Sequence, residues 1–315
     1  MSNPVPFLDA DDVARALTPA GAARAVTAAL EAGLDPAQDA PREVVDLANG
    51  QLLLMPSETA TAVGLKAAAV APGNPAKGHP RVQASYLLLD RDTLALTALV
   101  DGTALTSLRT PAVSMAALLP LVDRLPAPAS VLVFGAGPQG TGHVEALADC
   151  PGVELGRVRF AVRDVDRARE ALPPGTELVP PADVSAAVRA ADVVVCATTA
   201  RTPLFDAADV RDDAVVLAVG THEPDARELP GALLGRATVV VEDVAAALRE
   251  AGDVVLAIEE GHLDADRLVP LADLVTGRAR PDTGRPVVFK STGMSWEDLA
   301  VAEALIRAHQ ARPAG

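Results

Sequence analysis

A short apolar run that ends in a glycine-rich turn constrains the fold of this chain more than any other stretch. Residues 131–134 are Val-Leu-Val-Phe, an unalternating apolar run typical of a parallel strand buried on both faces. A Gly-x-Gly-x-x-Gly motif follows, and residues 138–149 then have the composition of a helix. The three glycines permit a tight turn, close approach of the backbone to a pyrophosphate, and close packing of helix on strand. Because a strand and a helix flank the motif, it predicts a dinucleotide site, whereas the alternative is an ordinary turn without a ligand. We expect the cofactor to contact the whole loop: Gly135, Ala136, Gly137, Pro138, Gln139 and Gly140.

The region from residue 113 to residue 291 alternates short apolar runs with helical segments. This alternation predicts a Rossmann domain, that is, a doubly wound parallel sheet of the α/β class. The predicted strands after the first are 158–162, 176–179, 192–198, 214–219, 238–241 and 285–290, and the predicted helices are 138–149, 164–172, 182–190 and 244–250.

Residues 1–112 have a different pattern, which predicts an α+β domain. Helices are expected at 11–17 and 19–32, and an Asn49-Gly50 turn indicates a hairpin between strands 42–47 and 51–55. A helix over 104–122 is expected to break before Pro111, because proline disfavours a helical residue in front of it. The last helix, 296–310, has Asp298 in capping-box spacing from Ser295, and we expect residues 292–315 to complete the first domain. Further strands are expected at 62–70, 82–90 and 93–100.

Charge and composition exclude several functional classes. The net charge is −15, which argues against a nucleic acid as partner. The N-terminus is acidic, so no signal peptide is expected, and no uninterrupted apolar run reaches the ~18 residues of a membrane span. Two cysteines make a disulfide framework or a zinc site implausible, so we expect a cytoplasmic protein without a bound metal or a membrane contact.

Lysine is scarce in this chain, and one lysine lies inside an apolar strand. Only three of the 27 basic residues are lysines, and Lys66 occupies the middle of the run 62–70. An ammonium in such a run either reaches solvent from an edge strand or is paired inside the protein. The second alternative predicts an anchor for a carboxylate or a proton-transferring lysine. Arg42 and Arg109 are further candidate anchors, although most arginines are solvated.

Several polar residues follow predicted strands of the Rossmann domain, where ligands of doubly wound sheets bind. His222 follows the fifth of these strands, and its ordinary pKa suits a proton donor at neutral pH, although a surface histidine is the alternative. Arg163 stands where an acidic residue would hold a ribose hydroxyl. A cation there favours the 2′-phosphate of NADP(H), while Asp164 leaves NAD(H) possible. Further cofactor contacts are expected from Thr198, Thr199, Val219, Gly220 and Ser291.

Nearly the whole chain resembles the ornithine cyclodeaminase/μ-crystallin family. The motifs that carry the resemblance are Leu54-Met-Pro56, Gly64-Leu-Lys66, Pro72-Gly-Asn74, Leu105-Thr-Ser-Leu-Arg-Thr-Pro111, the Gly135 loop, 219–228 (Val-Gly-Thr-His-Glu-Pro-Asp-Ala-Arg-Glu), 289–293 and Glu297-Asp-Leu299. The resemblance implies a substrate-binding and dimerisation domain beside the Rossmann domain, and therefore a homodimer. It also implies that Arg42, Lys66 and Arg109 bind the carboxylate of a small imino or amino acid. Matching positions predict that Met55, Arg81 and Thr292 also contact substrate, and that Arg109 and Thr110 contact the cofactor.

Two departures from the family pattern narrow the predicted activity. Cyclodeaminases and the related alanine dehydrogenase carry aspartate where this chain has His222, and the family usually has threonine where this chain has Arg81. The favoured prediction is an NAD(P)H-dependent oxidoreductase that reduces a cyclic ketimine of the pyrroline-2-carboxylate type, or oxidises the amino acid in reverse. In this prediction Lys66 polarises the imine and His222 delivers a proton to its nitrogen. The alternatives are an ornithine or lysine cyclodeaminase that uses catalytic NAD, and a non-catalytic, crystallin-like protein that holds NADP(H).

Overall fold

The computed structural model describes residues 5–311, which form two compact units. Unit 1 takes the chain up to Val113 and again from Met294 onward, and unit 2 is Ser114–Gly293. The assignment of substrate binding and dimerisation to the first part of the chain stays a prediction.

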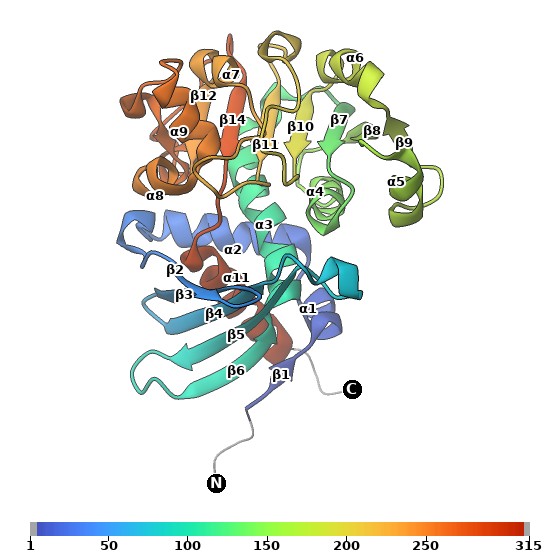
Figure 1. Cartoon of the computed structure of the whole chain (residues 1–315). Coiled ribbons are helices and arrows are strands. Elements are labelled where there is room, and N and C mark those ends of the chain that lie inside the picture. The colour runs from blue at the N-terminus through green and yellow to red at the C-terminus, as the bar shows by residue number, and fades with distance from the viewer. Residues whose placement is uncertain (1–4, 312–315) are drawn as a thin grey trace. The chain divides into compact units, whose positions relative to one another are not determined.

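Unit 1 is built on a six-stranded sheet with the strand order β1-β6-β5-β4-β3-β2 (Figure 1). All neighbouring strands are antiparallel except β1 and β6, which run parallel. The strands are β1 (Phe7–Leu8), β2 (Glu43–Leu47), β3 (Gly50–Glu58), β4 (Ala62–Val70), β5 (Val82–Asp90) and β6 (Leu96–Asp101).

One face of this sheet is covered by the C-terminal helix α11 (Ser295–Gln310), which packs on β4 and β3 and against α2 (Pro19–Glu31) (Figure 1). Side chains along β4 alternate between buried and half-buried positions, so the buried set faces the helix. Leu299 and Leu305 supply the apolar stripe of α11, and both are fully buried. Helix α1 (Ala10–Ala16) also contacts α11, so the last helix completes the core of the N-terminal residues.

Helix α3 (Gly102–Leu118) continues through Pro111, so the expected break before this proline is wrong. Proline removes only one helical hydrogen bond, the one that its nitrogen would donate to the carbonyl of Ser107. The helix before and after Pro111 is buried, and packing of its apolar side chains outweighs that loss. Two hydroxyls, of Thr106 and Ser107, donate to carbonyls one turn earlier and support the first turns.

Unit 2 is an eight-stranded parallel sheet with the order β13-β12-β14-β11-β10-β7-β8-β9 (Figure 1). The α/β, Rossmann-type fold class is therefore confirmed. The strands are β7 (Ala129–Phe134), β8 (Leu155–Ala161), β9 (Glu177–Val179), β10 (Val193–Cys196), β11 (Val215–Ala218), β12 (Thr238–Val241), β13 (Val269–Pro270) and β14 (Val287–Lys290), and the helices are α4 (Pro138–Ala148), α5 (Val165–Ala171), α6 (Val184–Arg189), α7 (Gly231–Arg236), α8 (Val244–Glu250), α9 (Gly252–Glu259) and α10 (Leu271–Val275).

The central strands of unit 2 are buried along their whole length because helices cover both faces of the sheet. This burial explains the unalternating valine runs in the sequence. Short elements without such a run were not predicted: β1, β13 and α7. Strand β6 begins at Leu96 instead of residue 93, because Leu94 adopts a positive φ of 56° in the turn before it.

One helical stretch, Gly102–Arg124, is long and apolar enough to cross a membrane by length and composition alone. Its most apolar window is 67% buried inside the structure, as is typical of a core helix. No group of three potential metal-ligating side chains occurs within residues 5–311.

Candidate functional site

The glycine loop joins β7 to α4, and each of its three glycines has a different structural role. Gly135 has a φ of +102°, and a Cβ there would lie 2.4 Å from the carbonyl oxygen of Ala197. A Cβ on Gly140 would lie 2.0 Å from the carbonyl oxygen of Gly135. Around Gly137, the N-cap of α4, no described atom lies within 4 Å of the Cβ position. Two glycines therefore close the turn, and the third leaves open space at a helix N-terminus, where backbone N–H groups attract a phosphate.

The loop lies at the switch point of the sheet. Strands β7, β8 and β9 follow one another in one direction, whereas β10 returns to the other side of β7. In doubly wound sheets ligands bind at the carboxyl ends of the strands at such a point. The residues predicted to contact the cofactor follow carboxyl ends of strands: Arg163 after β8, Thr198 and Thr199 after β10, Val219 and Gly220 after β11, and Ser291 after β14.

A buried carboxylate, Glu228, joins two of these strand ends. It accepts hydrogen bonds from the backbone N–H of Thr198 (2.7 Å), from the Thr198 hydroxyl (2.8 Å) and from the backbone N–H of Gly220 (2.7 Å). Burial raises the pKa of Glu228, and the nearby charge of Lys290 opposes this rise. The Thr198 hydroxyl therefore points into the protein, where it orders the loop. Glu228 was not among the predicted site residues because it lies in an irregular segment, although it is the last residue of the family motif 219–228.

A second buried carboxylate, Glu242, holds the end of β14 in the same way. It accepts hydrogen bonds from the Ser291 hydroxyl and from the backbone N–H groups of Thr292 (2.9 Å) and Gly293 (3.1 Å). Glu242 directly follows β12, so its position at a strand end was a signal that could have identified it.

Lys290 and Asp253 form a fully buried ion pair below the loop that carries His222. Their charged atoms are 3.0 Å apart, and Lys290 also donates to the carbonyl oxygen of Thr221 at 2.7 Å. Asp253 accepts the backbone N–H groups of Glu228 and Leu229. These contacts fix the backbone on both sides of His222, whose own side chain is exposed at the carboxyl end of β11.

In unit 1, Lys66 is buried and paired, so the alternative of a solvated edge lysine is wrong. Its ammonium lies 2.6 Å from Asp298, which also accepts a hydrogen bond from Arg109 at 3.1 Å. Arg109 donates to Glu297 at 2.7 Å. Burial lowers the pKa of Lys66, the charge of Asp298 partly offsets this effect, and the resulting pKa is about 8. The four side chains form a buried cluster of two cations and two carboxylates.

The predicted capping box at the start of α11 is wrong, because Asp298 takes part in the buried cluster and not in a cap. Met294 is the N-cap of this helix, and its own side chain makes no capping hydrogen bond, whereas the carboxylate of Asp39 accepts the backbone N–H of Trp296 at 2.9 Å. Asp298 is instead directed at Lys66 and Arg109, because two buried cations bind a carboxylate more strongly than a free backbone N–H does.

The other residues of unit 1 that were predicted to bind substrate or cofactor lie at different distances along the sheet or helix from Lys66. Met55 pairs with Lys66 in the β3–β4 register and is buried. Arg42 is half-buried and immediately precedes β2, whose first residue pairs with Leu54, so Arg42 lies near the same end of the sheet. Arg81 is exposed at the start of β5, five residues from the partner of Lys66, and the structure does not bring it beside the cluster. Thr110 is buried next to Arg109 on α3.

Comparison with known proteins agrees with this architecture. The family model of the ornithine cyclodeaminase/mu-crystallin family matches residues 7–311. This chain belongs to that family. A Delta(1)-pyrroline-2-carboxylate/Delta(1)-piperideine-2-carboxylate reductase of Azospirillum brasilense is 34% identical over 320 residues, which cover 99% of both chains.

Two solved structures have similar folds. One is a Delta(1)-pyrroline-2-carboxylate reductase of Thermococcus litoralis in complex with NADH and L-proline, with a TM-score of 0.86, 26% identity, and coverage of 97% of this chain and 98% of that chain. The other is an archaeal alanine dehydrogenase dimer with bound NAD, with a TM-score of 0.86, 26% identity, and coverage of 99% of this chain and 98% of that chain.

Proposed function

We propose that this protein is an NAD(P)H-dependent reductase of a small cyclic imino acid of the pyrroline-2-carboxylate type. The observation that carries the proposal is that the chain combines an open glycine loop with a buried lysine–arginine cluster. The loop suits a dinucleotide, and the cluster suits a carboxylate. The names of the Azospirillum and Thermococcus relatives support this substrate class.

The cofactor is assigned to unit 2. The open space at Gly137 and the N-terminus of α4 fit the pyrophosphate, and Glu228 and Glu242 hold the strand ends around it. When bound, a reduced nicotinamide supplies the hydride that imine reduction requires. Arg163, which is exposed two residues after β8, favours NADPH over NADH because it offers a cation to the 2′-phosphate.

The imino acid carboxylate is assigned to the basic residues of unit 1. Lys66 and Arg109 are joined in one cluster by Asp298, and Arg42 lies near the same end of the sheet. Ammonium and guanidinium groups bind carboxylates through charge-assisted hydrogen bonds, so these three residues suit a substrate carboxylate. Lys66, held charged by Asp298, also polarises the imine, and His222 delivers the proton to its nitrogen.

The test is an assay of purified protein with pyrroline-2-carboxylate and piperideine-2-carboxylate, each with NADPH and NADH. We expect nicotinamide absorbance to fall with turnover, fastest with NADPH, and to stay constant in a Lys66→Met variant. An ornithine or lysine cyclodeaminase would instead release ammonia without a net change in absorbance. A crystallin-like binding protein would bind NADPH without turnover. Either result would contradict the proposal.

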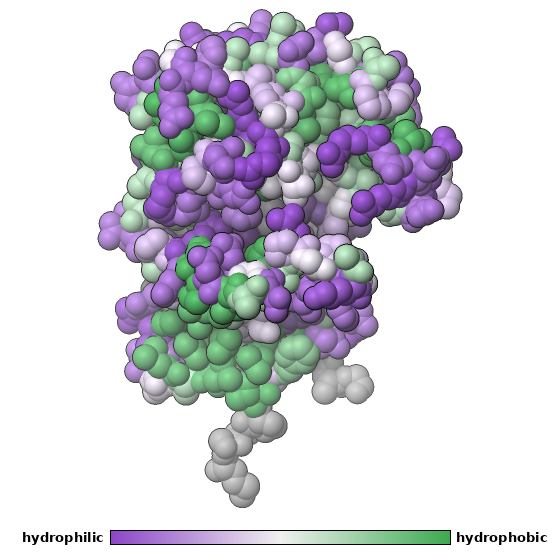
Figure 2. Space-filling view, viewed as in Figure 1, coloured by the Kyte–Doolittle hydropathy of each residue, from purple (hydrophilic) through white to green (hydrophobic). Residues whose placement is uncertain are grey.

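We further propose that unit 1 forms a homodimer through its exposed sheet. Figure 2 shows a broad hydrophobic area on unit 1. Val44 (48% exposed) and Leu47 (55%) on edge strand β2 are part of the apolar surface of this unit. Large exposed apolar surfaces and unpaired edge strands mark association sites. A Val44→Lys/Leu47→Glu double variant is expected to be a monomer by light scattering, and an unchanged mass would contradict this interface.

The cysteines are consistent with a reducing compartment, and we propose the cytoplasm. Cys150 and Cys196 are both free and buried. Burial raises the pKa of each thiol, so neither is a reactive thiolate at neutral pH. Fractionation of the native source, with the protein in the cytosolic fraction, is the expected result.

A further inference from the structure

Unit 2 contains a cavity at the opposite edge of its sheet from the glycine loop. The cavity has a volume of about 550 Å³. Its lining residues all precede strands: Asp212 before β11, Gly235 and Arg236 before β12, Arg267 before β13, and Gly284 and Arg285 before β14. These four strands are neighbours in the sheet, so their amino ends converge on the cavity.

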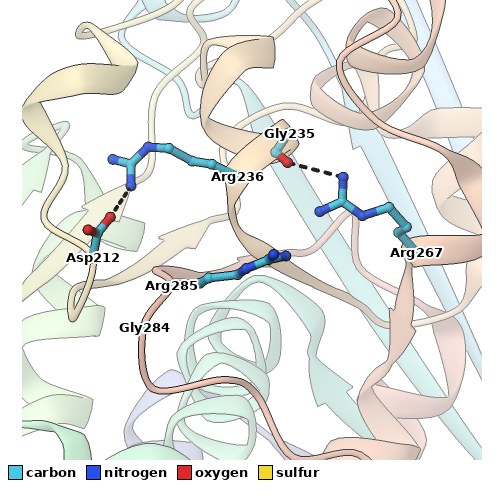
Figure 3. Close-up of a pocket in the computed structure, with 6 residues that line it drawn as sticks. All are labelled: Asp212, Gly235, Arg236, Arg267, Gly284 and Arg285. Carbon is cyan, nitrogen blue, oxygen red and sulfur yellow. Dashed lines mark hydrogen bonds and ion pairs between the residues drawn. The ribbon is translucent and has the colours of Figure 1, made fainter.

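Three arginines line this cavity, and within residues 5–311 only Arg236 forms an ion pair with a carboxylate. Arg236 pairs with Asp212 at 2.7 Å and donates to the carbonyl oxygens of Ala207 and Val210. In Figure 3 this side chain extends toward Asp212, away from the other two. Among the described residues, no carboxylate forms an ion pair with Arg267 or Arg285, so the cavity lining carries two positive charges beyond the Arg236–Asp212 pair in a protein whose net charge is −15.

The other two arginines face one another across the cavity. Figure 3 shows the side chain of Arg285 extending toward Arg267. Arg267 donates to the carbonyl oxygen of Gly235 at 3.1 Å, and within residues 5–311 the guanidinium of Arg285 has no hydrogen-bond or ion-pair partner. Two like charges that extend toward each other repel, so an anion between them stabilises both.

The backbone around these side chains is held in place before any ligand binds. Arg124 donates to the carbonyl oxygens of Asp282 (2.8 Å) and Arg285 (2.6 Å). The backbone N–H of Gly284 donates to the Asp282 carboxylate at 3.0 Å. A site whose frame is fixed in this way loses little conformational entropy on binding.

We propose that this cavity, named here the arginine cavity, is a binding site for an oligophosphate anion, separate from the dinucleotide site. Guanidinium groups bind phosphate oxygens through paired hydrogen bonds, and two of them can hold neighbouring phosphates of a chain. The volume lies within the range of about 300–1,000 Å³ that small-molecule sites occupy, so a triphosphate fits with or without an attached nucleoside.

The test is isothermal titration of the whole protein with inorganic triphosphate and, in a second arm, with a nucleoside triphosphate. Both titrations are run with and without saturating NADPH. We expect one bound anion per chain, unaffected by NADPH, and at least about tenfold weaker binding in an Arg267→Gln/Arg285→Gln double variant. The arm with the tighter binding identifies the source of the phosphates.

The control is Arg24→Gln, which removes one exposed charge from α2 in unit 1. It is expected to leave triphosphate binding unchanged. Binding that NADPH abolishes would place the anion at the glycine loop, and binding that the double variant retains would place it elsewhere. Either result, or no binding in either arm, would overturn the proposal. Arg285→Gln alone, at a position without side-chain partners in the described chain, provides a second test if the double variant unfolds.

Discussion

The Lys66 ammonium lies 2.6 Å from the carboxylate of Asp298, a residue 232 positions later in the chain. The pair joins β4 to α11, and both side chains are buried. Opposing effects set the pKa of Lys66: burial and the charge of Arg109 lower it, the negative charge of Asp298 raises it, and the resulting pKa is about 8. Asp298 is therefore the residue that keeps Lys66 charged at neutral pH.

This pair predicts a specific pH dependence of imine reduction. Lys66 is charged below its pKa, so kcat/KM is expected to fall as the pH rises through about 8. In an Asp298→Asn variant the charge that raises this pKa is absent, and the fall moves to lower pH. A Lys66→Arg variant stays charged throughout, so whatever activity it retains loses this dependence. The measurement is kcat/KM against pH for the three proteins.

Glu303 on the same helix offers a matched control. It accepts a hydrogen bond from the Thr59 hydroxyl at 3.2 Å, outside the cluster. Glu303→Gln is expected to leave the pH profile in place. A purely structural role for Asp298 would lower activity without moving the profile, and that result would contradict the assignment.

The sequence left two alternatives for Lys66, a solvated edge lysine and a lysine paired inside the protein, and it did not identify the partners. A lysine in an apolar strand needs either solvent or a counter-charge, and the local pattern shows that need. The counter-charge comes from a helix at the other end of the chain, where Asp298 matched a capping box just as well. Sequence spacing reports local geometry, so contacts between distant segments were not predicted.

For the same reason, the glycine loop was predicted from the sequence, whereas the two buried carboxylates that hold the neighbouring strand ends were not. The loop is a continuous motif whose chemistry is local, and its strand and helix were predicted within a few residues. Glu228 and Glu242 act on backbone N–H groups 8 to 51 residues away. At Pro111 the local pattern itself was misleading. Proline disfavours a helix at this point, but packing of the buried helix outweighed that preference.

A substitution at Gly137 is expected to weaken dinucleotide binding without changing the fold. A Cβ at Gly137 meets open space, whereas one at Gly140 meets the Gly135 carbonyl oxygen at 2.0 Å. Gly137→Ala is therefore expected to melt like the native protein and to bind NADPH more weakly, because its methyl group occupies the pyrophosphate position. Gly140→Ala is expected to lower the melting temperature. Tight NADPH binding by a folded Gly137→Ala variant would argue against the site.

Glu228 predicts a combined effect on stability and cofactor binding. Glu228→Gln removes one acceptor oxygen, so the partly buried N–H of Thr198 or Gly220 loses its acceptor, at a cost of about 1 kcal/mol. Both N–H groups lie at strand ends, so NADPH affinity is expected to fall as well. Glu223→Gln, which removes an exposed ion pair with Arg201, is the control and is expected to change neither quantity. Equal effects of the two variants would refute the assigned role.

Arg163 is expected to determine the preference of the protein for NADPH over NADH. Arg163→Ser is expected to weaken NADPH binding by at least about tenfold and to leave NADH binding nearly unchanged, because only NADPH carries the 2′-phosphate. Arg157→Gln, which removes an exposed charge from β8, is expected to affect neither. Dissociation constants from cofactor fluorescence give the comparison. Equal losses for both dinucleotides would show that Arg163 does not read the 2′-phosphate.

His143, on the helix that follows the glycine loop, is expected to make the folding stability of unit 2 depend on pH. Its Nδ1 is 2.7 Å from the carbonyl oxygen of Gln139, which can only accept, so Nδ1 carries the proton. Nε2 therefore accepts a hydrogen bond from the Ser114 hydroxyl at 2.9 Å. Burial lowers the pKa of this neutral histidine from 6.5 to about 4.

Between these two values the unfolded chain binds a proton that the folded protein excludes, so acid favours unfolding. The stability that this histidine contributes is complete above pH 6.5 and is lost as the pH falls toward 4. The loss from this residue is about 3 kcal/mol. Denaturant unfolding at pH 7 and pH 5 is expected to show about 2 kcal/mol of this loss, because the titration is complete only below pH 4. Gln does not titrate, so the stability of a His143→Gln variant is expected to change less between these pH values than that of the native protein. A Ser114→Ala variant keeps His143 and is therefore expected to keep the pH dependence. A Gln variant with the native dependence would show that other groups cause the acid instability.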